Sequence, residues 1–134
     1  MNVPLLVAGS LALAGAAIHG GAGEVLVVRR LPPAALPSTR FGGPGMTKAM
    51  IAVTWHLTTM AFLVVGATLV LSGSVLHGDA ARAVGVVAAA AATGFAAVMV
   101  GLGAATTRSV RPFVRHPGPL VFVAIAALAW AGIA

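Results

Sequence analysis

One carboxylate and two histidines lie inside long apolar stretches of the chain, where ionisable side chains are rare. Glu24 follows His19 by five residues in the apolar run 3–28, and His56 lies in the next apolar run. The chain has only two acidic residues, and the other, Asp79, falls in a polar connection. An ionisable group at membrane depth is costly, so it normally faces other helices, pairs with another group and marks a site. These three residues are therefore the candidate site.

Depth along the helices places the three side chains in one layer. Counted inward from the basic residues that end each run, Glu24 lies ~8 Å, His56 ~12 Å and His19 ~15 Å below the boundary, at 1.5 Å per residue. Antiparallel neighbouring helices would bring groups at these depths together. Trp55 and Thr59 flank His56 in the sequence and complete the predicted ligand- or proton-binding set.

On a regular α-helix, the spacing of His19 and Glu24 would point their side chains in different directions. Residues five apart lie about 140° apart around a regular α-helix, so the two side chains would not share a face. The intervening segment Gly20–Gly23 contains three glycines. Such a segment permits a π-helical turn, whose i to i+5 spacing aligns the two side chains and which is frequent at functional sites. We therefore predict a π-helical turn here, and an unbroken α-helix from Ala16 to Val28 would contradict it.

Three chemical interpretations of this layer compete. In the first, His19, Glu24 and His56, with His116, bind a divalent metal, because imidazole and carboxylate suit Zn, Fe or Cu. In the second, His19 and His56 are the axial ligands of a b-type haem held between helices. The chain contains no cysteine, which excludes disulfides, thiolate metal sites and c-type haem attachment.

In the third interpretation, Glu24 and a histidine form a proton-exchanging pair, because imidazole titrates near neutrality. In a purely structural interpretation, Glu24 pairs with His56 or a nearby arginine and only stabilises helix packing. Enzymatic activity stays open but is the class with least support. The chain has no cysteine, no tyrosine and no second acidic residue in an apolar run from which to assemble a nucleophile and its base.

Composition and hydropathy predict the fold. The chain has 134 residues, 60% of them hydrophobic and 7% charged, with a mean hydropathy of +1.06. Such values are typical of membrane-spanning helices. We predict an all-α integral membrane protein, a four-helix bundle forming one transmembrane domain over residues 1–134. Its four spans are 3–28, 49–71, 83–105 and 117–134, and the last is marginal in length. We expect the first to be retained, because residues 1–4 lack the basic residues of a signal peptide.

The distribution of basic residues predicts the orientation. Seven of the eight lie in the first and third connections, and only Arg82 lies in the second. By the positive-inside rule the first and third connections are cytoplasmic and both termini are extracytoplasmic. This pattern also explains the net charge of +6 without nucleic acid as a partner. We expect a multi-pass protein of the cell's inner (plasma) membrane.

The expected partners are the lipid bilayer and other protein chains. Arg108, Arg111 and Arg115 form a cluster that could hold anionic lipid headgroups. Small residues at four-residue spacing, such as Ala16 and Gly20, let helix backbones approach closely. Together with the small size of the chain, they suit a homo-oligomer or an accessory subunit of a larger membrane complex.

Three short motifs carry a resemblance. The segment Ile18–Glu24, the pair Trp55–His56 and the late pair His116–Pro117 occur in this order. The pattern resembles small four-span bacterial membrane proteins of uncharacterised function. The resemblance implies a four-span helical fold and implies no activity.

Overall fold

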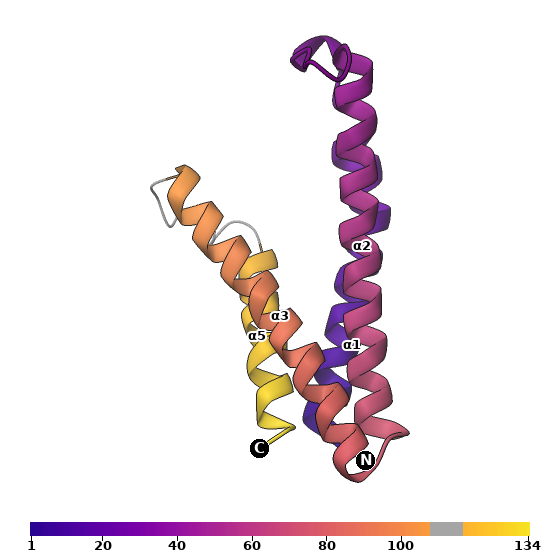
Figure 1. Ribbon diagram of the computed structural model, residues 1–134, viewed down its shortest axis with the longest axis vertical. Coiled ribbons are helices and arrows are strands. Elements are labelled where there is room, and N and C mark those ends of the chain that lie inside the picture. Colours follow the sequence, from indigo (N-terminus) through magenta and orange to yellow (C-terminus); the bar gives the residue numbers. More distant parts are fainter. Residues whose placement is uncertain (108–116) are drawn as a thin grey trace. The chain divides into compact units, whose positions relative to one another are not determined.

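A computed structural model describes residues 1–107 and 117–134, and over these ranges the chain is helical and contains no strand. Figure 1 colours the helical elements along the sequence. They are α1 (Val3–Ala17), the π-helical segments η1 (Ile18–Ala22) and η2 (Glu24–Val28), the short 3-10 helix η3 (Pro33–Ala35), α2 (Pro44–Ser74), α3 (Gly78–Thr107) and α5 (Gly118–Ala131).

Three of the helical stretches are long and apolar enough to cross a membrane. They are Val3–Val28, Pro44–Ser74 and Gly78–Thr106, with mean hydropathies of 1.7, 1.8 and 2.1. The predicted all-helical fold is confirmed over the described residues, and these three helices are consistent with a membrane protein. The helix α5 has 14 residues, about 21 Å at 1.5 Å per residue, and is shorter than the predicted fourth span.

The helix α2 begins at Pro44 and has 31 residues, so it starts five residues before the predicted span. The prediction followed hydropathy, and Thr47 and Lys48 end the apolar run without ending the helix. Proline is favoured at the first helical position, because its missing N–H has no helical partner there and its φ angle suits the helix. Hydropathy therefore marked where the apolar part of the helix begins and not where the helix itself begins.

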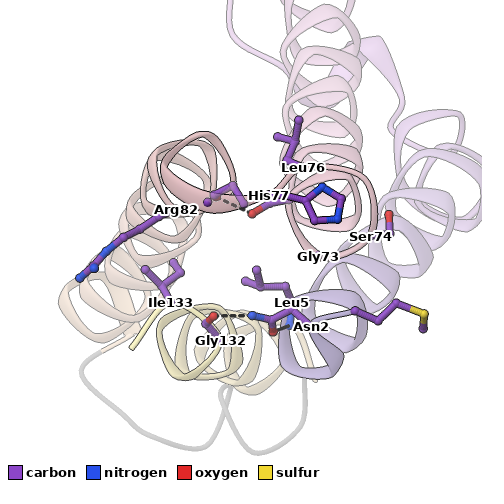
Figure 2. Close-up of a pocket in the computed structure, with 13 residues that line it drawn as sticks. Asn2, Leu5, Gly73, Ser74, Leu76, His77, Arg82, Gly132 and Ile133 are labelled. Carbon is purple, nitrogen blue, oxygen red and sulfur yellow. Dashed lines mark hydrogen bonds between the residues drawn. The ribbon is translucent and has the colours of Figure 1, made fainter.

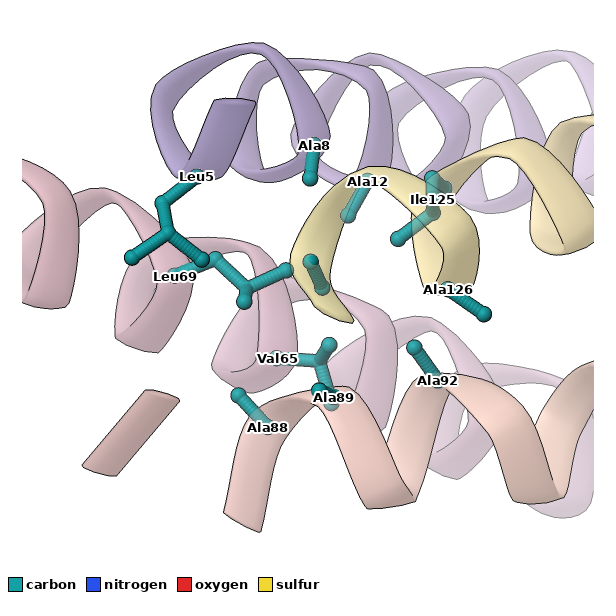
Figure 3. Close-up of a cluster of buried hydrophobic side chains, with 11 residues drawn as sticks. Leu5, Ala8, Ala12, Val65, Leu69, Ala88, Ala89, Ala92, Ile125 and Ala126 are labelled. Atoms are coloured by element: carbon teal, nitrogen blue, oxygen red, sulfur yellow. The ribbon is translucent and has the colours of Figure 1, made fainter. Parts of the chain in front are cut away.

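The contacts divide the chain into two compact units, residues 1–13 with 64–134 and residues 14–63. In the first unit all four helices contribute to one core, drawn in Figure 3. Alanine dominates this core, and its small side chain lets helix backbones approach closely. The buried cluster consists of Leu5, Ala8, Ala12, Val65, Leu69, Ala88, Ala89, Ala92, Ile125, Ala126 and Ala129.

A reciprocal glycine contact joins α1 to α2 in the same unit. A Cβ atom added to Gly9 would lie 2.8 Å from the Gly66 carbonyl oxygen, and one added to Gly66 would lie 3.0 Å from the Gly9 carbonyl oxygen. A side chain at Gly9 would require the backbone of α2 to move, and one at Gly66 would press on the Leu13 side chain as well as on the Gly9 carbonyl. The predicted close packing of small residues is therefore present between these helices.

The ends of the helices in this unit surround a hollow of about 360 Å³, shown in Figure 2. Asn2 ties the surrounding segments together. Its backbone N–H donates to the Gly73 carbonyl (2.8 Å) and its side-chain amide donates to the Gly132 carbonyl (2.6 Å). Arg82 contributes to the lining, but its guanidinium extends away from the hollow (Figure 2).

Candidate functional site

The predicted π-helical turn is confirmed. Residues Ile18–Ala22 and Glu24–Val28 are π-helical, and the N–H of Gly23, between them, donates to the Ile18 carbonyl, five residues back. In consequence both His19 and Glu24 contact α2, which a regular α-helix would not allow. The whole site lies within the unit formed by residues 14–63.

Two glycines of the π-helical region bring α2 close. A Cβ atom added to Gly20 would lie 2.7 Å from Thr59 Cγ2, and one added to Gly23 would lie 2.4 Å from Trp55 Cζ2. Both distances are shorter than real Cβ contacts, so larger residues would displace the side chains of α2. The glycine-rich segment thus supplies both the helix type and the space for the site.

The imidazole of His19 is held on three sides. Its ring stacks on the Trp55 indole, with centroids 4.2 Å apart and planes 11° from parallel. The Phe62 ring meets it edge-on at 5.4 Å. Its Nδ1 atom lies 2.9 Å from Thr59 Oγ1, and the indole N–H of Trp55 donates to the His19 carbonyl at 2.9 Å. This residue therefore has one defined position.

The surrounding hydrogen bonds also assign the protons of His19. The Thr59 hydroxyl donates its single proton to the Trp55 carbonyl (3.1 Å), so it can only accept from His19. Nδ1 must then carry a proton, an assignment inferred from the hydrogen-bond network. In the neutral ring Nε2 is left as the acceptor.

Glu24 lies between a cation and the second histidine. Its Oε1 atom accepts from Arg29 Nε at 3.2 Å, and Oε2 lies 3.4 Å from His56 Nε2. The Glu24 side chain is 22% exposed, whereas His56 is 53% exposed. The Oε2 atom itself is buried, and within the residues that the structure describes it has no hydrogen-bond partner. The predicted contact is present, but His56 lies at the edge of the helix pair.

A basic residue, Lys48, lies at the loop end of the site. The ammonium group of Lys48 donates to the Arg29 carbonyl at 3.5 Å. Arg29 is 71% exposed, so its ion pair with Glu24 is screened and contributes little to stability. Its main effect is to fix one carboxylate oxygen and leave the other facing His56.

The predicted residues thus form two neighbouring groups. His19 joins Trp55 and Thr59, while Glu24 joins His56. Among the residues that the structure describes, no three histidines or carboxylates are placed to hold a metal ion. His116, the fourth predicted metal ligand, and the predicted headgroup residues Arg108, Arg111 and Arg115 lie outside the described residues.

The predicted set omitted Phe62 and Arg29. The first could have been found, because Trp55, Thr59 and Phe62 follow one another at four- and three-residue spacing and therefore share a helix face. Arg29 lies five residues after Glu24, a spacing that joins side chains only where the helix is π-helical.

No family model, curated protein or solved structure matches the chain. The interpretation of the site therefore depends on its own geometry and chemistry.

Proposed function

We propose that the protein is a four-span membrane protein in which Glu24 and His56 form a proton-exchanging site. The observation that carries this proposal is the buried Oε2 atom of Glu24, which lacks a hydrogen-bond partner among the described residues and lies 3.4 Å from His56 Nε2. A buried acceptor without a donor is costly. A proton held by either residue can form the missing hydrogen bond, so the pair is suited to take up and release one proton.

The two residues differ in exposure, and this difference supports a direction for the proton transfer between them. His56 is half exposed and Glu24 is largely covered. Imidazole is the side chain whose ordinary titration lies nearest to neutral pH. We propose that His56 exchanges protons with the surroundings and that Glu24 accepts them inside the helix pair, with His19 positioned beside them by Thr59.

The test is an infrared pH titration of the purified protein in lipid nanodiscs. The chain has only two acidic side chains, Glu24 and Asp79, so the carboxyl bands can be assigned with two variants. We expect Glu24→Gln to remove a carboxyl band that responds to pH, whereas Asp79→Asn, the matched control, leaves that band in place. We expect His56→Gln to change the pH at which the Glu24 band responds.

Other outcomes support the alternative functions. If the Glu24 band is the same with and without His56, the pair does not exchange a proton and the accessory-subunit interpretation gains support. Stoichiometric metal by elemental analysis would indicate that the site binds a divalent metal and not a proton. A Soret band would indicate haem b.

We also propose the orientation and location of the protein. In a bacterial plasma membrane the Arg29–Lys48 connection would be cytoplasmic and the Gly78 turn extracytoplasmic, because Arg29, Arg30, Arg40 and Lys48 lie in the former. The absence of cysteine allows single-cysteine labelling without background. A membrane-impermeant maleimide added to intact cells should label Val75→Cys and not Ser38→Cys, and the reverse would overturn the orientation.

A further inference from the structure

The connection between η2 and α2 presents an arginine and a phenylalanine at the tip of a tight turn. Thr39 and Gly42 exchange two backbone hydrogen bonds, of 2.8 and 3.1 Å, so Arg40 and Phe41 are the two residues at the tip. The Thr39 hydroxyl accepts from the Phe41 N–H at 3.2 Å. The turn is therefore a defined local structure within the unit of residues 14–63.

The turn is also fixed to the start of α2. Gly42 has φ +154°, a conformation that favours glycine, and a Cβ atom there would lie 2.7 Å from Met46 Cβ. The Thr47 hydroxyl donates to the Pro37 carbonyl at 2.9 Å, which holds the other side of the loop. Figure 1 shows this loop at the end of the helix pair.

The side chains at the tip have an unusual combination of exposure and chemistry. Phe41 is 75% exposed and Met46 is 50% exposed, although both are apolar. The Arg40 guanidinium lies 4.8 Å from the centre of the Phe41 ring. Arg29 and Arg30 before the loop and Lys48 near the start of α2 add positive charge beside it, and the neighbouring acidic residue, Glu24, is already paired with Arg29.

The length of α2 suits a position of this loop at headgroup level. With the apolar part of α2 from Ala49 onward spanning the hydrocarbon, the first five helical residues, Pro44–Lys48, would extend about 7 Å further at 1.5 Å per residue. That depth corresponds to the headgroup region of a bilayer, in which aromatic and cationic side chains are favoured.

We propose that the turn formed by Thr39–Gly42 is an anchor for anionic lipid headgroups. Arg40 pairs with headgroup phosphates, and the Phe41 ring enters the boundary between headgroups and acyl chains. Charge complementarity selects anionic lipid over other occupants, because basic residues near a negatively charged leaflet are attracted to it. The anchor does not depend on the proton-exchanging site.

Spin labelling tests this proposal in the full chain. Nothing lies within 4 Å of a Cβ atom at Gly43, so a nitroxide on Gly43→Cys reports on the turn without displacing it. The protein is reconstituted in vesicles of phosphatidylcholine, with or without phosphatidylglycerol, and collisions of the label with oxygen and with a water-soluble nickel complex are measured. We expect phosphatidylglycerol to move the label from nickel-accessible to oxygen-accessible surroundings and high salt to reverse the shift.

Two variants separate the roles of the tip residues. Arg40→Gln should lower the ratio of buried to exposed label in phosphatidylglycerol about fivefold, the change that ~1 kcal/mol per basic residue at an anionic surface corresponds to. Phe41→Ser should leave the label nickel-accessible in both lipids. The matched control is Arg82→Gln, which removes one charge near the start of α3, away from the turn in the sequence, and should leave the shift unchanged.

Three results would overturn the anchor. They are equal nickel accessibility in both lipids, a shift retained in Arg40→Gln, and protection that grows with the protein-to-lipid ratio. The last would indicate a second protein chain as the occupant. Circular dichroism of each variant shows whether the helices are intact.

Discussion

The hydrogen bond between Thr59 and His19 determines which imidazole nitrogen carries a proton. Because the Thr59 hydroxyl donates to the Trp55 carbonyl, it accepts from His19 Nδ1. Thr59→Val removes that acceptor at nearly constant volume, whereas Thr59→Ser retains the hydroxyl. This pair of substitutions separates hydrogen bonding from packing.

We expect Thr59→Val to shift His19 from the Nδ1-protonated form to a mixture of tautomers, and Thr59→Ser to leave it unchanged. The loss of the bond should also reduce the free energy of unfolding by about 1 kcal/mol. Nitrogen-15 NMR of labelled histidine measures the tautomer directly. A spectrum of Thr59→Val identical to that of the wild type would contradict the proton assignment.

The two glycines Gly21 and Gly23 offer a second test at the level of single residues. A Cβ atom at Gly23 would meet Trp55 at 2.4 Å, whereas one at Gly21 meets nothing within 4 Å. We expect Gly23→Ala to destabilise the protein by about 1–3 kcal/mol, the usual effect of overpacking. Gly21→Ala should be neutral or slightly stabilising, because alanine favours helix over glycine.

Unfolding in detergent, followed by fluorescence in a Trp130→Phe background, measures both variants. In that background Trp55 is the only tryptophan. Equal stability of the two variants would show that Trp55 can move away from Gly23 without loss.

At the level of the helix, the π-helical turn determines which residues meet α2. A π turn holds one residue more than an α turn, and removing one residue restores α-helical geometry. We expect deletion of Gly21 to restore α-helical geometry. The deletion should then break one of two contacts, either that of Glu24 with His56 or that of His19 with Thr59. The infrared response of Glu24 and the NMR tautomer of His19 distinguish the two results, and Gly21→Ala is the control for loss of the glycine itself.

Helix-level features were partly predictable from the sequence. The positions of the long helices follow from hydropathy, and the π turn follows from the spacing of His19 and Glu24 together with the glycines between them. The start of α2 did not follow, because Thr47 and Lys48 are polar yet helical. The hydrogen bond from the Trp55 indole to the His19 carbonyl did not follow either, since it depends on how closely two helices approach.

At the scale of the molecule, the first compact unit depends on a core made largely of alanine. Ala89 is fully buried, whereas its neighbour Ala90 is exposed. We expect Ala89→Leu to lower the free energy of unfolding by about 1–3 kcal/mol because the core has no space for it. Ala90→Leu adds the same hydrophobicity on the outer face and should have little effect, so unfolding of the two variants under the same conditions measures packing alone.

The alanine core was predictable in kind but not in detail. Small residues are typical of close helix packing in membranes, and of the alanines in α3, Ala88, Ala89 and Ala92 are buried in the core. Gly94 and Gly101, small residues of the same helix, have nothing within 4 Å of an added Cβ atom. Which small residues pack depends on helix rotation, and a helix with small residues on several faces does not fix its rotation.

Seven of the eleven buried residues of this core are alanine, which has no side-chain rotamers, so the core has few ways to change shape by switching rotamers. The helices of the first unit therefore fit together by backbone shape and have few ways to adapt to a bilayer of different thickness. We expect them to respond by tilting together and not by sliding past one another. Spin labels on the outer faces of α3 and α5 should keep their mutual distance when the acyl chains of the surrounding lipid are lengthened, while the depth of each label changes.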